Sequence, residues 1–227
     1  MNENLELKER KLFVRRKLSK AQELAIFDLI SRRRPFQLGF KQPYKNIKLT
    51  LWTRDLMKQY IKNKWEVELT NADVVNYLKL WGFSPLNRHK SKIEQCPKVF
   101  KEWLDIHMDN LIDRSKAQKA QIYWVGDIAS VGLSHSRPGA QKGLRMVSAI
   151  QTQGRLLWMI VRGPFTPKRQ VMFLKSLAGQ SRTKVFLIRR NLNHFDNELV
   201  SEWLKENKAS FEIFPPLETA IQGTHTE

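Results

Sequence analysis

The sequence predicts a mixed α/β (α+β) fold, in which a helical N-terminal part precedes a mixed β-sheet with flanking helices. Apolar residues recur at helical spacing between residues 21 and 83, whereas strand-like apolar runs alternate with helical ones after residue 121. The 227 residues allow one large domain or two small ones. The predicted parts are a basic arm at 1–20, a helix-turn-helix unit at 21–90, a linker helix at 91–120 and a sheet domain at 121–227.

The first predicted helix covers residues 21–31 and begins after Ser19, a residue type that caps helix N-termini. It ends at the run Arg32-Arg33-Arg34-Pro35. The segment 35–48 contains Pro35, Gly39 and Pro43, which indicates an irregular basic loop. Such a loop fits a phosphate contact and a solvated connector equally well.

Two short helices are predicted next, at residues 51–65 and 70–83, with Thr53 and either Thr70 or Asn71 as N-caps. Gly82 ends the second helix. Two helices joined by a short turn are typical of a helix-turn-helix, whose second helix enters the major groove. The polar positions Thr70, Asn71, Asp73 and Asn76 would then face bases or phosphates, although an ordinary helical hairpin has the same periodicity.

Residues 87–92 are polar and basic and indicate a linker, and residues 97–112 form a predicted helix with one apolar face that bridges two domains. The remaining elements follow the order β-β-β-α-β-α-β. They are strands at 121–127, 144–151 and 155–163, a helix at 167–177, a strand at 184–190, a helix at 196–207 capped by Asp196, and a strand at 211–216. This order predicts three antiparallel strands followed by crossovers that build a parallel edge.

The same order, preceded by a helix-turn-helix, resembles the mariner-type DDE transposases, in particular their bacterial insertion-sequence branch. The similar segments are 50–83, IYWVGD (122–127), VSAIQTQGRLLWMIVRG (147–163), KVFLIRRNLNHF (184–195) and VSEWLKENKASFEIFPP (200–216). The resemblance implies a winged helix-turn-helix followed by a ribonuclease-H-like sheet. It also implies a site in which three carboxylates hold two Mg²⁺ ions for phosphodiester cleavage and strand transfer.

The family's catalytic carboxylates carry over incompletely. Asp127 matches the first aspartate, but Arg190 stands where the second would precede Asn191. After Pro215-Pro216 the sequence departs from the family pattern, and neither Glu218 nor Glu227 matches the third carboxylate. A cation at the second position repels a divalent ion, so we expect Asp127 to be a vestige and catalysis to be lost.

Charge is the strongest compositional signal. Lysine and arginine number 40 against 22 acidic residues, which gives a net charge of +18 and points to a polyanion, most often nucleic acid. The excess is present in every third of the chain. A single cysteine, Cys96, and five scattered histidines show no metal-ligand spacing. No apolar run approaches the length of a membrane span, so we expect a cytoplasmic, nucleoid-associated protein.

These observations favour a non-catalytic, transposase-derived protein that binds specific duplex DNA and regulates transcription or a mobile element, with no cofactor. The alternatives are a truncated or divergent transposase with residual Mg²⁺-dependent nicking, and an RNA-binding adaptor, which is less favoured. A homodimer would match a two-fold DNA site. The expected DNA contacts are Arg32, Arg33, Arg34, Lys41, Lys45, Lys48, Thr70, Asn71, Asp73, Asn76, Lys79, Arg88, Lys90, Lys92, Arg189 and Arg190.

Overall fold

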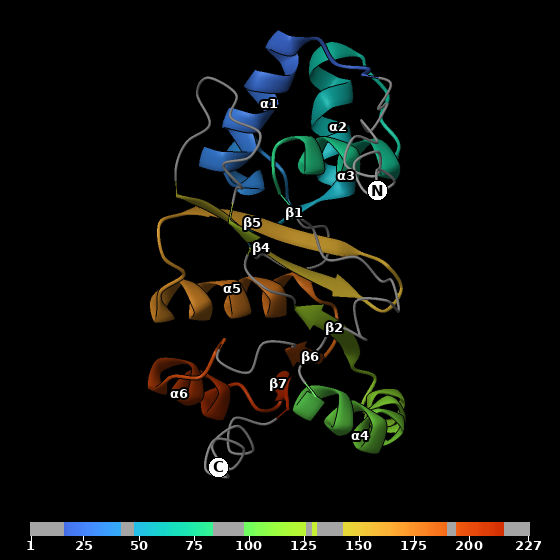
Figure 1. Cartoon of the computed structure of the whole chain (residues 1–227), viewed down its shortest axis with the longest axis vertical. Helices are drawn as coiled ribbons and strands as arrows, with labels where there is room; N and C mark the ends of the chain where they lie inside the picture. The colour runs from blue at the N-terminus through green and yellow to red at the C-terminus, as the bar shows by residue number, and fades with distance from the viewer. Residues whose placement is uncertain are drawn as a thin grey trace, which may run out of the picture.

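The computed structural model describes residues 16–41, 48–83, 98–125, 129–130, 143–189 and 194–215. Helices occupy the N-terminal part, and a mixed sheet with further helices follows (Figure 1). The elements in chain order are α1 (Lys20–Arg32), the 3₁₀ helix η2 (Pro35–Leu38), β1 (Trp52–Thr53), α2 (Arg54–Trp65), α3 (Asn71–Leu80), α4 (Lys98–Ala117), β2 (Gln121–Val125), β3 (Ala129–Ser130), β4 (Leu144–Gln151), β5 (Leu156–Arg162), α5 (Pro167–Gln180), β6 (Val185–Arg189), α6 (Glu198–Glu206) and β7 (Phe211–Phe214).

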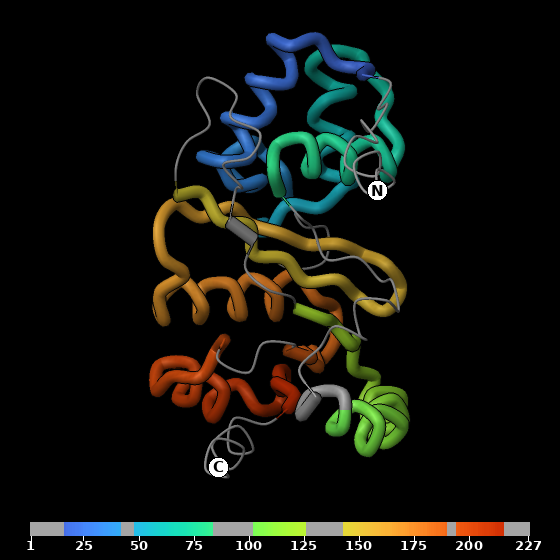
Figure 2. The backbone as a smooth tube through the Cα atoms, viewed as in Figure 1, coloured from blue at the N-terminus to red at the C-terminus, as the bar shows by residue number. Residues whose placement is uncertain are grey.

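The strands form one sheet in the order β1-β5-β4-β2-β6-β7, with β3 paired to β4. The pairs β1–β5, β4–β5 and β2–β4 are antiparallel, whereas β2–β6 and β6–β7 are parallel. The predicted mixed α/β fold is therefore confirmed, including the antiparallel start and the parallel edge. Figure 2 shows the course of the backbone through these elements.

Alternation along the strands gives the sheet two apolar faces. On β5, Leu157 and Met159 face one side and Trp158 and Ile160 the other, and all four are buried. Helices α5 and α6 cover the first face, where Phe173 and Val200 join its core. This burial on both faces explains the nearly unbroken apolar runs in the central strands.

The second face is covered by two groups of helices. The N-terminal helices pack on β4 and β5 through a cluster that includes Ile26, Met57 and Trp158, while α4 packs Leu104 and Leu111 on β2, β6 and β7. The helical unit predicted at 21–90 therefore shares a core with the sheet. Likewise α4, which was predicted to be a linker helix, packs on the sheet as part of its helical layer.

Most helix starts follow the sequence signals. Ser19, Thr53 and Thr70 each accept a hydrogen bond from a backbone N–H of the first turn, as predicted. The predicted cap of α6 is wrong by one residue, because Asn197 rather than Asp196 accepts the bond from the Val200 N–H.

Candidate nucleic-acid interface

The helix pair α2–α3 is held rigidly against the rest of the fold. Val74, Tyr77 and Leu78 are buried along one side of α3. The Tyr77 hydroxyl accepts hydrogen bonds from the backbone N–H groups of Lys17 and Leu18, both at 2.9 Å. The turn before α3 begins at Glu66, which takes the left-handed conformation with φ of 56°. The second helix is thus fixed in orientation by its buried side.

The N-terminus of α3 is closed by its own side chains. Thr70 Oγ1 accepts from the Asp73 N–H at 3.1 Å, and Asp73 Oδ2 accepts from the Thr70 N–H at 2.7 Å. Asp73 also pairs with Lys17 Nζ at 2.9 Å. Burial opposes ionisation, but the hydrogen bonds from Thr70 and Lys17 outweigh it and lower the pKa of Asp73. Thr70 and Asp73 are occupied by this cap, so we withdraw them from the expected DNA contacts.

The outward side of α3 is polar and basic at one end. Asn76, which is half-buried, and Lys79, which is exposed, lie on the side of the helix away from the buried residues, whereas Asn71 is exposed because it stands in the first turn. A helix with a buried apolar side and an outward row of amide and ammonium groups has the form needed to enter a groove of DNA. Asn71, Asn76 and Lys79 are therefore the positions of the expected set that α3 presents to a ligand.

The cations of the predicted basic loop, and of the arginine run that precedes it, differ in their exposure to solvent. Arg32, Arg33, Lys41 and Lys48 are exposed, although Arg32 Nε already pairs with Asp28 at 2.6 Å. Arg34 is half-buried, and desolvation and the nearby charge of Arg169 lower its pKa. Of this segment, Arg33, Lys41 and Lys48 remain as expected phosphate contacts.

The end of β6 differs from the expectation. Arg189 has no exposed surface, and its guanidinium donates to the backbone oxygens of Pro215 at 3.3 Å and His194 at 3.0 Å. Burial lowers the pKa of Arg189, and Asp196 partly offsets this effect. The expected contact between Arg189 and DNA is wrong, because a side chain enclosed in the fold reaches no phosphate.

Several expected residues lie outside the described residues. They are Lys45, Arg88, Lys90, Lys92, Asp127 and Arg190. Among the residues that the structure does describe, no group of three histidine, cysteine or acidic side chains could hold a metal ion. None of the helices in that same part of the chain is both long and apolar enough to span a membrane.

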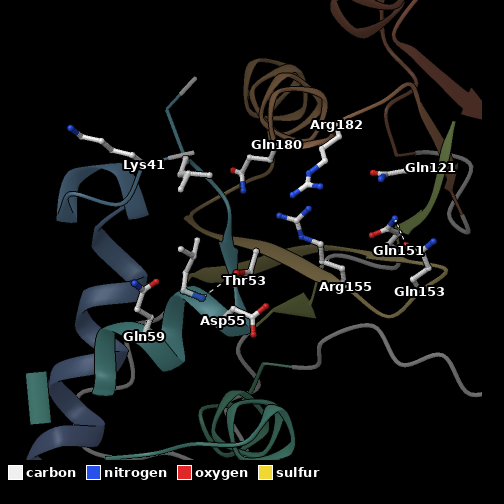
Figure 3. Close-up of a pocket in the computed structure, with 12 residues that line it drawn as sticks. Lys41, Thr53, Asp55, Gln59, Gln121, Gln151, Gln153, Arg155, Gln180 and Arg182 are labelled. Carbon is white, nitrogen blue, oxygen red and sulfur yellow. Dashed lines mark hydrogen bonds between the residues drawn. The ribbon is translucent and has the colours of Figure 1, made fainter. Parts of the chain in front are cut away.

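A second cationic site has no signal in the sequence. Arg155, in the turn between β4 and β5, and Arg182, just after α5, line one pocket together with Lys41 (Figure 3). The pocket has a volume of about 460 Å³. No motif marks these residues, because they are far apart in the chain. The packing of α5 on the sheet brings the two arginines together, and the packing of the helical unit on the sheet adds Lys41.

Comparison with known proteins agrees with the geometry of the helix pair. Residues 50–106 match the family described as winged helix-turn helix, a segment that contains α2 and α3. No curated protein and no solved structure matches the chain. The chain thus carries a winged helix-turn-helix unit, and residues 84–97 of the matched segment lie outside the described ones.

Proposed function

We propose that the chain is a sequence-specific DNA-binding protein whose helix α3 enters the major groove of duplex DNA. One observation carries this proposal: the winged helix-turn-helix match coincides with a capped helix pair whose second helix has a buried side and a polar outward side. The net charge of +18 supports a polyanionic partner. An ordinary helical hairpin would explain neither the match nor the charge.

Each outward residue of α3 has a distinct role in this proposal. The side-chain amides of Asn71 and Asn76 suit the donor and acceptor pair on the edge of adenine. Lys79 is a mobile point charge and suits a phosphate oxygen. Loss of an amide should therefore reduce discrimination between sequences, whereas loss of Lys79 should weaken binding to all of them.

We further propose that the protein derives from a DDE transposase, no longer cleaves DNA, and acts as a regulator of transcription or of a mobile element. The strand order β5-β4-β2-β6-β7, three antiparallel strands followed by two parallel ones, supports a ribonuclease-H-like ancestry. Arg190 in place of the second carboxylate supports the loss of catalysis. Such a protein would be cytoplasmic, would bind its site as a homodimer, and would need no cofactor.

The test is selection of bound fragments from genomic DNA, followed by a cleavage assay on supercoiled plasmid with Mg²⁺ or Mn²⁺ in the same preparation. We expect one recurring sequence and intact plasmid. Recovery of random fragments would contradict sequence-specific binding. Nicking that requires the metal and is abolished by Asp127→Asn would contradict the loss of catalysis and favour a residual transposase.

A further inference from the structure

The pocket of Arg155 and Arg182 lies where the N-terminal helices meet the sheet. Its walls come from α2 and the segment before it, the turn between β4 and β5, the start of β2 and the end of α5 (Figure 3). Gln121, which opens β2, lines the pocket, whereas Asp127 follows the other end of that strand. The pocket is therefore separate both from the outward side of α3 and from the strand ends where the family's carboxylates would sit.

Positive charge converges in this pocket. The guanidinium groups of Arg155 and Arg182 are exposed and point toward one another across it. Lys41 also lines the pocket, but its ammonium group points away from the two arginines (Figure 3). Among the described residues that line the pocket, Asp55 is the only acid, and its carboxylate pairs with Lys58 at 2.9 Å. Two facing guanidinium groups are most stable with an anion between them, and their fork geometry matches phosphate oxygens.

The pocket has rigid walls. The amide of Gln180 accepts from the Leu51 N–H at 2.6 Å and donates to the Leu51 carbonyl at 3.2 Å, which ties α5 to the segment before α2. Arg54 donates to the carbonyl of Gly154, which ties α2 to the turn that carries Arg155. Both bridges cross the junction, so they fix the backbone of the end of α5 and of the turn before β5, from which the two arginines project.

A second groove, lined by lysines and by the apolar side chains of Val171 and Met172, lies along α5. Leu49 lines the pocket, and its neighbours Lys48 and Thr50 line the groove, together with Lys168 and Lys175 of α5. No acid lines this groove among the described residues, and α5 itself contains none. Lys168 and Lys175 are two turns apart, about 10.5 Å along the helix axis, and α5 extends about 18 Å from Lys168 to Gln180. One strand of duplex DNA carries about five phosphates over that length.

We propose that the pocket and the groove form a second nucleic-acid contact, in which Arg155 and Arg182 clamp one backbone phosphate and the lysines of α5 follow the strand beside it. The row of cations along α5 favours a backbone over an isolated phosphate, which would need only the pocket. The contact deepens the proposed function, since the clamped strand would belong to the duplex that α3 reads. It would strengthen binding to every sequence without adding specificity.

The experiment compares the full-length protein with the double variant Arg155→Gln/Arg182→Gln. The matched control is Lys116→Gln/Lys119→Gln, which removes the same charge from exposed positions at and just beyond the end of α4, on the opposite face of the sheet from α5. Affinity for a labelled duplex of random sequence is measured by fluorescence polarisation between 50 and 300 mM KCl. Because both arginines are exposed, the double variant should melt at the same temperature as the parent.

We call Arg155→Gln/Arg182→Gln the clamp variant. We expect its duplex affinity to be about tenfold lower than that of the parent at 0.1 M salt, and the slope of log affinity against log salt concentration to be smaller by about one unit. The control variant should change less in both respects. Equal losses in the two variants would overturn the clamp. A second result would also overturn the clamp. If a labelled mononucleotide binds the parent but not the clamp variant, while the two proteins bind duplex equally well, then the pocket serves a free nucleotide.

The inference and the proposed function fail separately. If Asn76→Ala leaves specific binding intact while the clamp variant loses affinity, the function assigned to α3 fails and the second contact stands. If the parent binds neither duplex nor single-stranded nucleic acid, both proposals fail.

Discussion

The two arginines on either side of the apolar run of β6 differ in their exposure to solvent. Arg182 precedes the strand, is exposed and faces a pocket, whereas Arg189 ends the strand and is completely buried. Arg189 follows the apolar run 185–188 directly, and Arg182 precedes it by three positions. The difference shows that a count of basic residues overstates the charge available to a ligand, because part of it is consumed inside the fold.

The buried Arg189 connects three segments of the fold. Its guanidinium connects the end of β6 to the backbone of His194 and of Pro215, which follows β7. In the same way, Lys184 and Arg114 are engaged by Glu212, the latter at 2.7 Å. The cations that we propose for nucleic-acid contacts lie on α3, in the basic loop and around the junction pocket.

The largest effect should come from removing the buried cation. Arg189→Ala leaves two carbonyl oxygens without their donor and opens a cavity, so we expect the free energy of unfolding to fall by about 3 kcal/mol. Arg182→Ala should change it by less than about 0.5 kcal/mol. Urea denaturation followed by tryptophan fluorescence measures both values. Equal stability of the two variants would contradict the structural role of Arg189.

The next contrast uses adjacent residues at the start of α3. Thr70→Ala removes the cap and should lower the free energy of unfolding by about 1 kcal/mol. Asn71→Ala should leave stability within about 0.5 kcal/mol of the parent and reduce DNA affinity instead. Thermal melts and duplex titrations of both variants test this division, and a stability loss in Asn71→Ala as large as that in Thr70→Ala would argue against it.

The smallest effect concerns pH. Partial burial of Glu212 is outweighed by its bonds to Lys184 and Arg114, so its pKa is lowered from the ordinary value. The ionised form therefore stabilises the fold above the ordinary glutamate pKa, and this contribution is lost as the pH falls below it through the lowered value. Since the side chain is about one-fifth exposed, we expect less than about 1 kcal/mol.

Denaturation of the parent and of Glu212→Gln at pH 3 to 6 measures how much the ionised Glu212 contributes to the free energy of unfolding. The variant should lose stability less steeply than the parent as the pH is lowered. Asp73 also has a lowered pKa and contributes in the same acid range, so Asp73→Asn is the companion variant. Parallel curves for the parent and Glu212→Gln would show that the ion pairs contribute nothing.

The sequence predicted the elements with strong local signals. Periodicity located α1, α2 and α3, the caps Ser19, Thr53 and Thr70 marked their starts, and unbroken apolar runs identified the central strands. In each case the residues that decide the structure are neighbours in the chain. Of the four polar positions that the sequence assigned to the outward side of α3, Asn71 is exposed and Asn76 is half-buried, whereas Thr70 and Asp73 form the cap.

Features that depend on distant contacts were not predictable. The two residues of β1 were assigned to a helix, since only their pairing with β5 makes them a strand. The burial of Arg189 depends on carbonyl groups that lie beyond the strand. The convergence of Arg155 and Arg182 requires α5 to pack on the sheet, which no local pattern encodes, and Lys41 joins their pocket only through the packing of the helical unit.

The most direct test of the central claim is the affinity of parent and Asn76→Ala for a selected duplex and for its scrambled version. The parent should prefer the selected duplex. The variant should lose about tenfold or more on that duplex, equivalent to about 1.4 kcal/mol, and little on the scrambled one. Equal affinity of the parent for both duplexes, or an unchanged preference in Asn76→Ala, would contradict the reading of DNA by α3.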